Sequence, residues 1–387
     1  MDLDRLRELD AADPLAGFRA RFDLPEDLAY LAGHSLGPPP RDAAARVQAL
    51  IGDWRSELVE AWTTSGWLDA PGRIGAKAAR LMGARAGEVT VSDSTTVNLF
   101  KLLAAVLRAT DRPGEVLTVE GEFPTDLYAA KAACDLHGRR LCKVTPDDLL
   151  QAIGQGPVLV VLSHAHYLGG EVRDMAAINA AAQAAGAFVL WDISHSLGVF
   201  PIDLEGAGAD LAVGCGYKHL CGGPGAPSLL YVAERHQDRL ASPIAGWFGH
   251  ARPFDFAPDY VPAEGVRRFL AGTPPMLSLA ALECGVDLAL EADLTAAQAK
   301  VQAMAAALIG LMAEARPDLA PLGPAPGQPR AGHVAFRCRG APALQRALLE
   351  RRIVCDARGE EVLRLSVSPL HVRFEDLGRA VGALGTL

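Results

Sequence analysis

Between about residues 85 and 235, short apolar runs alternate with alanine-rich stretches, and this alternation constrains the fold more than any other feature. The apolar runs lack polar alternation, which indicates strands of a parallel sheet buried on both faces. Strands are predicted at 116–119, 158–162, 188–191, 211–213 and 229–232, and helices at 127–136 and 175–185. The pattern predicts an α/β fold with a mostly parallel central sheet flanked by helices.

The chain after residue 275 has a different pattern. Long helices are predicted at 277–293 and 294–315, and a connector rich in proline and glycine follows at 317–329. A smaller C-terminal α+β unit is predicted from strands at 333–337 and 362–367 and helices at 343–351 and 374–384. We therefore expect an N-terminal segment packing on the small domain (1–60), a large domain (61–275), and a long helix with the small domain (276–387).

Charge and cysteine content exclude several classes of partner. Lys and Arg number 37 against 46 Asp and Glu, the net charge is −9, and no basic stripe marks a nucleic-acid surface. The acidic start is unlike a signal peptide, and no apolar run reaches the roughly 18 residues of a membrane span. The seven cysteines are scattered without a paired motif, which is typical of reduced thiols. We expect a cytoplasmic protein that binds neither nucleic acid, nor membrane, nor metal.

One local motif points to a different chemistry. Residues 33–37, Gly33-His34-Ser35-Leu36-Gly37, match the nucleophile elbow of serine hydrolases. That elbow must lead directly into a helix, whereas three prolines follow here and the motif precedes the strand–helix region. A tight glycine turn is the favoured interpretation, and serine hydrolase stays as an alternative function.

An acid and a lysine follow two successive strands. The strand at 188–191 runs into Asp192, and the next strand is followed by Tyr217 and Lys218. Both positions lie at the carboxyl edge of the sheet, where ligands bind. A lysine there suits Schiff-base chemistry, and the carboxylate suits the pyridine nitrogen of pyridoxal phosphate.

Two further segments agree with pyridoxal phosphate. Residues 92–96, Ser-Asp-Ser-Thr-Thr, lead into a helix predicted at 97–107, and hydroxyls at a helix N-terminus suit a phosphate. Phe123 follows a strand where an aromatic lid over the ring is expected.

Over essentially its whole length the chain resembles the kynureninases, a family of fold type I (aspartate aminotransferase-like) pyridoxal phosphate enzymes. The motifs that carry the resemblance are Tyr30-Leu-Ala-Gly-His-Ser-Leu-Gly, Asp93-Ser-Thr-Thr-Val-Asn-Leu, Glu122-Phe-Pro-Thr-Asp, Trp191-Asp-Ile-Ser-His-Ser, Gly216-Tyr-Lys-His-Leu-Cys-Gly-Gly-Pro-Gly, Gly246-Trp-Phe-Gly-His, Phe269-Leu-Ala-Gly-Thr-Pro-Pro and Leu363-Arg-Leu-Ser-Val-Ser-Pro-Leu-His-Val-Arg-Phe. The Trp-Phe-Gly-His and Gly-Thr-Pro segments separate it from the cysteine desulfurases, which share the fold.

The resemblance implies a role for each matching residue. Lys218 is the expected Schiff-base lysine, Asp192 the pyridinium partner, and Phe123 the ring that stacks on the cofactor, with His195 close by. The residues expected to bind phosphate or fix the cofactor's polar groups are Thr95, Thr96, Asp126, Ser163 and Tyr217. Trp247 and Thr273 are expected to reach the phosphate bound in a partner subunit, so the resemblance implies a homodimer with active sites at the interface.

The substrate side of the site is also implied. Arg364 is expected to bind the α-carboxylate of an amino acid substrate, and His34 with Trp62 or Trp67 the aromatic end. Departures from the family pattern are His34, where asparagine is expected, and His219 and Cys221, where tyrosine and asparagine are expected.

The reaction implied is hydrolysis of the Cβ–Cγ bond of L-kynurenine to anthranilate and L-alanine, a step of tryptophan catabolism that also serves NAD biosynthesis. Lys218 would move the α-proton and Tyr217 would be a proton donor or only a phosphate ligand. The resemblance leaves 3-hydroxykynurenine open as a second substrate, although Gly272-Thr273 resembles the bacterial form that favours L-kynurenine. A cysteine desulfurase or selenocysteine lyase is the nearer alternative, but Cys338 and Cys355 lie outside any loop signature.

Overall fold

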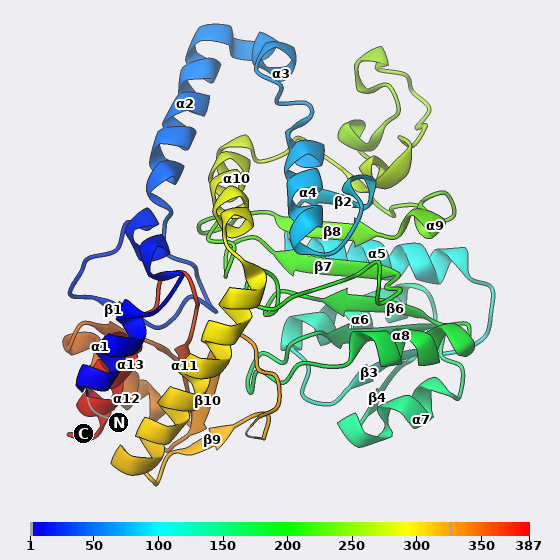
Figure 1. The fold of residues 1–387 in the computed structure, drawn as a ribbon. Helices are drawn as coiled ribbons and strands as arrows, with labels where there is room; N and C mark the ends of the chain where they lie inside the picture. The colour runs from blue at the N-terminus through cyan, green and yellow to red at the C-terminus, as the bar shows by residue number, and fades with distance from the viewer. Residues whose placement is uncertain (1–2, 326) are drawn as a thin grey trace.

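A seven-stranded mixed sheet forms the centre of the computed structural model, which describes residues 3–325 and 327–387 (Figure 1). The strand order is β2-β8-β7-β6-β5-β3-β4. The strands are β2 (Val89–Ser92), β3 (Val116–Val119), β4 (Leu141–Val144), β5 (Leu159–Ser163), β6 (Phe188–Asp192), β7 (Leu211–Cys215) and β8 (Ser228–Val232). The predicted mostly parallel α/β sheet is confirmed.

Strand β8 runs opposite to both of its neighbours, β7 and β2. A parallel neighbour would need a crossover, usually through a helix, whereas the short loop 216–227 joins β7 to β8 directly. Strands β7, β6, β5, β3 and β4 are parallel, so their carboxyl ends meet at one edge. The lysine of interest lies in the reversing loop beside that edge.

Helices cover both faces of this sheet. Neighbouring strand residues point to opposite sides, so Val160 and Val161 belong to different hydrophobic clusters. One face is covered by α5 (Thr95–Ala109) and α6 (Pro124–Leu136). The opposite face is covered by α4 (Ala70–Leu81), α7 (Leu149–Ile153), α8 (Met175–Ala184) and α10 (Met276–Glu291). The short helix α9 (Glu234–Gln237) follows β8.

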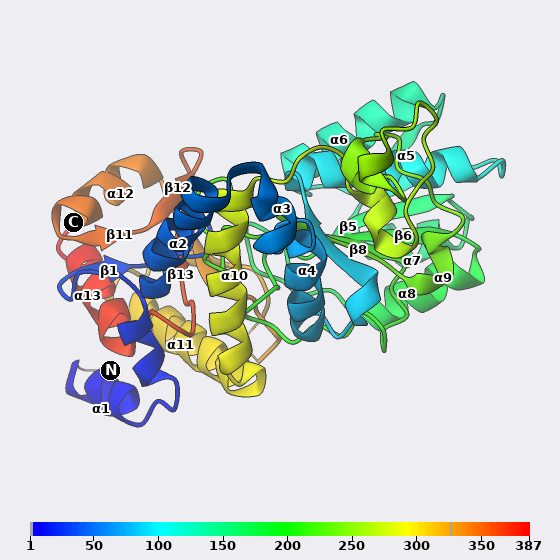
Figure 2. The same cartoon turned by 90° about the horizontal axis from the view of Figure 1, so that it is seen from above.

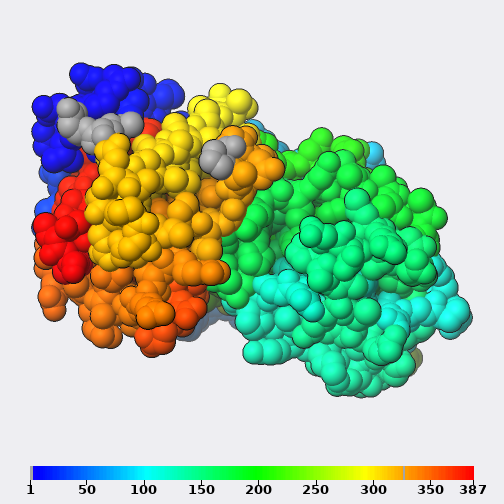
Figure 3. Space-filling model, turned by 90° about the horizontal axis from the view of Figure 1, so that it is seen from below, coloured from blue at the N-terminus to red at the C-terminus, as the bar shows by residue number. Residues whose placement is uncertain are grey.

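The C-terminal part forms a second unit around a four-stranded antiparallel sheet of order β12-β13-β10-β9. Its strands are β9 (Ala320–Leu322), β10 (His333–Arg337), β12 (Asp356–Arg358) and β13 (Val362–Ser366), and its helices are α11 (Leu294–Ala315), α12 (Ala341–Glu350) and α13 (Phe374–Leu384). Helices α11 and α13 share a hydrophobic cluster with this sheet. The two units form two lobes (Figure 3).

The N-terminal segment divides between the two units. Helix α1 (Leu3–Ala11) packs on α13, and β1 (Ala29–Tyr30) pairs with β11 (Ile353–Val354), as a segment packing on the small domain should. Helix α2 (Arg41–Glu57), which leads to α3 (Ala61–Thr64), packs on α10 instead (Figure 2).

The predicted boundary between residues 275 and 276 differs from the observed packing. Leu279, Leu282 and Val286 of α10 lie in the same hydrophobic cluster as the central sheet. Val301 and Met304 of α11 lie in the cluster of the small domain. The packing favours a division near residue 292, because α10 belongs to the large domain and α11 to the small one.

Helix α11 is long and apolar enough, by length and composition, to cross a membrane. Half of its most apolar window is buried inside the molecule, against α13 and the small sheet. A helix in the core of a protein can be equally long and apolar, and the packing of α11 accounts for its apolar composition.

Gly285 is the point where α10 approaches the loop after β7. A Cβ at this position would overlap the backbone carbonyl oxygen of Leu220. We expect Gly285→Ala to lower the free energy of unfolding by about 1–3 kcal/mol or more, since a helix and a loop backbone must separate. The control is Gly310→Ala in α11, where a Cβ meets open space; it should stabilise by up to about 1 kcal/mol. Equal denaturation midpoints for the two variants would contradict this packing.

Candidate active site

The carboxyl ends of β5, β6 and β7 bring the predicted catalytic residues together. Ser163 and Asp192 are the last residues of β5 and β6, and they are paired in the sheet register. Lys218 follows β7 in the loop 216–227. This edge is where open α/β sheets bind ligands.

Lys218 is in contact with His195 and near Phe123. Its Nζ lies 3.0 Å from Nε2 of His195 and 5.9 Å from the centre of the Phe123 ring. Burial, reinforced by the charge of Lys218, holds the pKa of His195 well below its ordinary value. The neutral imidazole accepts a hydrogen bond from Lys218, while its buried Nδ1 has no hydrogen-bond partner among the described residues.

Two buried carboxyl groups lie side by side near this lysine. Asp126, in the first turn of α6, is hydrogen-bonded to Asp192. Burial, and then the charges of Asp192 and Glu122, raise the pKa of Asp126 well above its ordinary value. Asp192 also accepts a hydrogen bond of 2.8 Å from the backbone N–H of Ser194. The pair therefore offers a protonated acid beside a carboxylate that a cationic ring nitrogen can pair with.

The N-terminus of α5 is built as an anion site. Ser94 caps the helix by accepting from the N–H of Val97, and Thr95 and Thr96 begin its first turn. The buried Oγ1 of Thr95 has no hydrogen-bond partner among residues 3–325 and 327–387. First-turn N–H groups and a hydroxyl without a partner suit a phosphate.

A buried lysine that the sequence did not reveal holds the turn before α5. Lys101 Nζ lies 2.8 Å from Asp93 Oδ2, 3.0 Å from Ser92 Oγ and 2.7 Å from the carbonyl oxygen of Phe269. Asp93 has a positive φ of 44°, a strained value for a residue other than glycine. Lys101 fixes this turn and so positions the first turn of α5.

Glu122 is a second missed residue. Its carboxylate accepts from the hydroxyl and the backbone N–H of Ser163, and its other oxygen lies 2.8 Å from Arg173. The hydroxyl of Ser163 is therefore used as a donor, and only its lone pairs are available to a ligand. The position of Glu122, immediately before Phe123 and after β3, was the signal that could have identified it.

Tyr217 lies beside Lys218 with its phenol protonated. Burial, and then nearby Cys215 and Asp192, raise the pKa of Tyr217 well above its ordinary value. Its backbone carbonyl accepts a 2.8 Å hydrogen bond from the N–H of Gly37. The phenol can donate a hydrogen bond to a ligand.

Arg364 is almost fully buried on β13 and reaches the site through Tyr167. Its Nη1 donates to the carbonyl oxygen of Tyr167, whose ring lies 5.3 Å from the ring of Phe123. Its Nη2 lies 3.0 Å from Ser35 Oγ, and Ser35 itself donates to Asp356. A serine bound to a carboxylate and a guanidinium is not activated by a histidine base, so the geometry gives no support to a serine hydrolase.

His34, one of the departures from the family pattern, is completely buried. Its ring stacks on His333 at 4.9 Å, and the ring of His333 lies 5.5 Å from that of His195. Burial, reinforced by the charge of Arg364, lowers the pKa of His34 to about 4, and its Nε2 lies 3.3 Å from Asp356. His34 therefore contributes a neutral imidazole to the inner wall of the site.

His219, the other departure, packs behind the lysine loop. Its Nδ1 lies 3.3 Å from Ser368 Oγ, and a Cβ at Gly332 would contact its ring. His219 is buried against Ser368 and Gly332 of the small domain, and it therefore joins that domain to the loop that carries Lys218.

The structure does not place Trp62 with His34. Trp62 lies in an aromatic cluster with Trp67, Trp247 and Phe248, at ring distances of 4.9–6.0 Å. Trp247 Nε1 lies 3.3 Å from Thr273 Oγ1, so this predicted pair is brought together, but in the aromatic cluster rather than beside Lys218.

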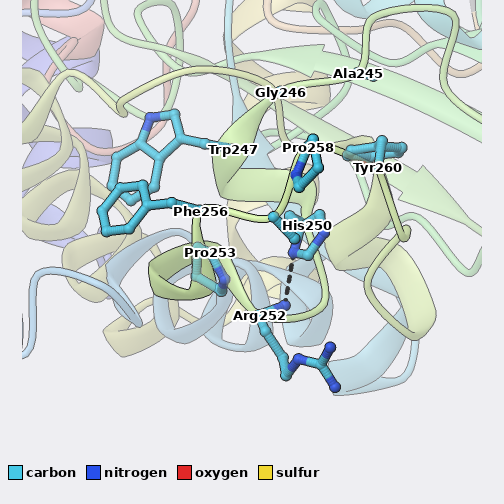
Figure 4. A pocket seen from close by; sticks show the side chains of 10 residues that line it. Ala245, Gly246, Trp247, His250, Arg252, Pro253, Phe256, Pro258 and Tyr260 are labelled. Carbon is cyan, nitrogen blue, oxygen red and sulfur yellow. Dashed lines mark hydrogen bonds between the residues drawn. The ribbon is translucent and has the colours of Figure 1, made fainter.

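A cavity of about 420 Å³ opens beside Trp247 (Figure 4). Trp247 and Phe256 lie on one side of the view and Tyr260 on the other (Figure 4). His250 Nδ1 accepts a 2.9 Å hydrogen bond from the N–H of Arg252, which fixes the loop. The cavity is lined by Ala245, Gly246, Trp247, His250, Arg252, Pro253, Phe256, Ala257, Pro258 and Tyr260.

All seven cysteines are free, and each lies within the described ranges. Cys338 and Cys355 are buried, and burial raises the pKa of the Cys355 thiol to about 12. A desulfurase needs a reactive cysteine on a mobile loop, and neither thiol meets that requirement.

The residues present fit pyridoxal phosphate. An amine at Lys218, a paired carboxylate at Asp192 and an aromatic ring at Phe123 are the groups that hold its aldehyde, nitrogen and ring. The unsatisfied Thr95 Oγ1 and His195 Nδ1 are polar atoms that such a ligand would satisfy.

Comparison with known proteins gives concordant results. The family model aminotransferase class-V matches residues 72–379. The kynureninase of Deinococcus radiodurans is 44% identical, with 100% of this chain and 96% of that protein covered. The kynureninase of Pseudomonas fluorescens is 40% identical, with 98% and 94% covered.

Solved structures of similar fold are more distant in sequence. A cysteine desulfurase from Thermococcus onnurineus superposes with a TM-score of 0.83 at 18% identity, covering 96% of this chain and 97% of that one. A mutant of the protein C-DES, with glycine covalently linked to its pyridoxal phosphate cofactor, gives 0.81 at 20% identity, covering 94% and 98%. These likenesses show the fold alone.

The raised pKa of Asp126 predicts a pH dependence of stability. Its pKa is higher in the folded than in the unfolded chain, so above the unfolded pKa unfolding releases its proton and stability falls as pH rises. Asp126→Asn removes this loss, and its stability relative to the parent protein should increase by up to about 1.4 kcal/mol per pH unit above about pH 4. Denaturant titration of the two cofactor-free proteins from pH 5 to 8 measures the difference in their free energies of unfolding. Asp147→Asn, on an exposed turn, is the control; a pH-independent difference for Asp126→Asn would contradict the assignment.

Proposed function

Since the chain belongs to the kynureninases within the aminotransferase class-V family, we propose that it hydrolyses the Cβ–Cγ bond of L-kynurenine, giving anthranilate and L-alanine. Pyridoxal phosphate, when bound, supplies an electron sink for the bonds that are broken at the substrate. The other tasks belong to side chains of this chain.

Each side chain has a task that its surroundings suit. Asp192 pairs with the ring nitrogen and keeps it cationic, and Asp126 holds that carboxylate in place by a hydrogen bond. Lys218 would hold the cofactor aldehyde and would take and return the proton at the substrate α-carbon, while neutral His195 accepts a hydrogen bond from its Nζ. Phe123, whose ring centre lies 5.9 Å from that Nζ, would cover the cofactor ring.

The remaining residues bind the phosphate and the substrate. Thr95 and Thr96 at the start of α5 bind the phosphate together with Tyr217, whose protonated phenol also suits a proton donor to the substrate γ-carbonyl oxygen. Arg364 binds the α-carboxylate, and His34 lines the substrate side.

One observation carries this proposal: Lys218 and Arg364 are joined by an unbroken set of contacts. Lys218 lies near Phe123, Phe123 near Tyr167, and Tyr167 accepts from Arg364. An amine for covalent binding and a guanidinium for a carboxylate therefore address the same small molecule. That molecule is an α-amino acid, and L-kynurenine is the member that the family acts on. We expect L-kynurenine to be a better substrate than 3-hydroxykynurenine, because Gly272-Thr273 resembles the bacterial form of the family. We also expect the enzyme to act in the cytoplasm.

The wild-type protein and Lys218→Ala provide the test. The purified wild type should be yellow and should release fluorescent anthranilate from L-kynurenine, and Lys218→Ala should lose the visible absorbance band of the bound cofactor and at least about 1,000-fold in kcat, because the amine is the nucleophile and the proton carrier. Hydrogen sulfide from L-cysteine without anthranilate from L-kynurenine would instead assign a desulfurase. A colourless wild type would overturn cofactor chemistry.

We also propose that the active enzyme is a homodimer whose second copy covers the aromatic cluster around Trp62 and Trp247. Trp54, Leu58 and Val59, near the end of α2, are 56%, 64% and 72% exposed, and Phe256 is 83% exposed. Trp62 connects these groups because it follows Val59 closely and contacts Trp247. Phe256 lines the same cavity as Trp247, and several large apolar side chains exposed in this region favour a protein partner. In the dimer Trp247 and Thr273 would complete the partner's phosphate site.

A charge in this patch should separate the copies. Val59→Asp places a carboxylate where the partner would pack, so we expect the mass measured by light scattering to fall from dimer to monomer, with at least about a tenfold loss of kcat/KM. Leu136→Asp is the matched control, because Leu136 is 67% exposed on α6, away from the patch. A dimer that persists in Val59→Asp, or a monomeric wild type with full activity, would contradict the proposal.

A further inference from the structure

Asp356 occupies one edge of the Arg364 guanidinium. The two residues are directly opposite each other in the antiparallel pair β12–β13. Arg364 Nε lies 2.8 Å from Oδ1 of Asp356, and Nη2 lies 2.6 Å from Oδ2. Such two-point pairing fixes the plane and the rotation of a guanidinium.

The other contacts of Arg364 define what remains for a ligand. Nη1 donates to Tyr167 and Nη2 to Ser35, while Nε is fully used by Asp356. The second N–H of Nη1 remains, on the edge away from Asp356. A substrate carboxylate can bind there while Asp356, Ser35 and Tyr167 keep their contacts, so Asp356 decides which edge of Arg364 meets the substrate.

The charge balance supports a carboxylate ligand. Burial alone would raise the pKa of Asp356, but contacts with His34 and Arg364 outweigh it and hold this pKa below its ordinary value. Arg358 lies 3.0 Å from the same carboxylate, while buried His34 is neutral. One carboxylate faces two guanidinium groups, which leaves a net positive charge for the substrate.

We propose that Asp356 is a positioning residue that holds Arg364 edge-on to the α-carboxylate of the substrate, with Ser35 supporting the pair. This inference rests on the proposed role of Arg364. It assigns to Ser35, the serine of the rejected hydrolase motif, a place in substrate binding. The alternative is a cross-strand ion pair that stabilises only the small sheet.

The test compares substrates with and without a carboxylate on the cofactor-loaded enzyme. Asp356→Asn should raise KM for L-kynurenine at least about tenfold and change kcat less than about threefold, because only binding of the carboxylate is lost. Spectral titration with kynuramine, the amine that corresponds to L-kynurenine without its carboxylate, should give a Kd within about twofold of the wild type. Ser35→Ala, a smaller change that keeps the pair, should raise KM about two- to fivefold.

Asp318→Asn is the matched control. Asp318 also pairs at two points with an arginine of the small domain, Arg316, at 2.8 Å each, but it is exposed and lies outside the site. The KM of Asp318→Asn for L-kynurenine should stay unchanged. The inference is overturned if Asp356→Asn weakens kynuramine and L-kynurenine equally, or if neither Asp356→Asn nor Ser35→Ala raises KM. If the wild type releases no anthranilate, the proposed reaction fails first, while titration with L-alanine still reports carboxylate binding in the variants.

Discussion

Close backbone packing around the loop of residues 216–222 is the constraint on which the rest of the site depends. Gly37 donates to the carbonyl of Tyr217, Gly285 lies against the carbonyl of Leu220, and Gly332 lies against the ring of His219. These three glycines come from the N-terminal segment, the large domain and the small domain. Side chains larger than hydrogen would separate these parts, so the site exists only when all three parts are assembled.

Electrostatics inside the site follows from this burial. The imidazoles of His34, His195 and His333 are buried and their pKa values lie below the ordinary range, while the pKa of Asp126 lies well above its ordinary range. Full charges are kept where a partner compensates them, as in the pair of Asp356 with Arg364. The wall of the site is thus mostly neutral, and the two groups that must bind anions, the helix α5 terminus and Arg364, stand out from it.

Much of this arrangement could be predicted from the sequence, and the missing parts have physical reasons. Apolar runs identified β3, β5, β6, β7 and β8 within one or two residues, because buried strands are continuous apolar runs. Strands β2 and β4 were not predicted, because β2 alternates apolar with polar residues and β4 is only partly buried. Asp192 and Lys218 were identifiable because each follows such a run. The reversed direction of β8 was not predicted, since periodicity does not encode strand direction.

The partners of the site residues were harder to predict because they depend on long-range packing. Glu122 contacts Ser163 from 41 positions away in the chain, and Lys101 contacts the carbonyl oxygen of Phe269 from 168 positions away. Asp356 contacts Arg364 across two paired strands. The residue type of Trp62 suggests a place with His34, but its position after α2 places it in the aromatic cluster. Helices α10 and α11 look alike in sequence, and only packing assigns them to different hydrophobic clusters.

The reversal of the chain at β8 has a mechanical consequence. The loop that carries Lys218 is anchored at both ends to adjacent hydrogen-bonded strands, and its interior is closed by bonds of 2.9 Å from Cys221 to Lys218 and from Gly222 to Gly216. Its main chain has little freedom to move. Any movement of the amine between the aldehyde and the substrate must come from rotation about the side-chain bonds of Lys218. The Cα of Lys218 stays fixed while its Nζ moves.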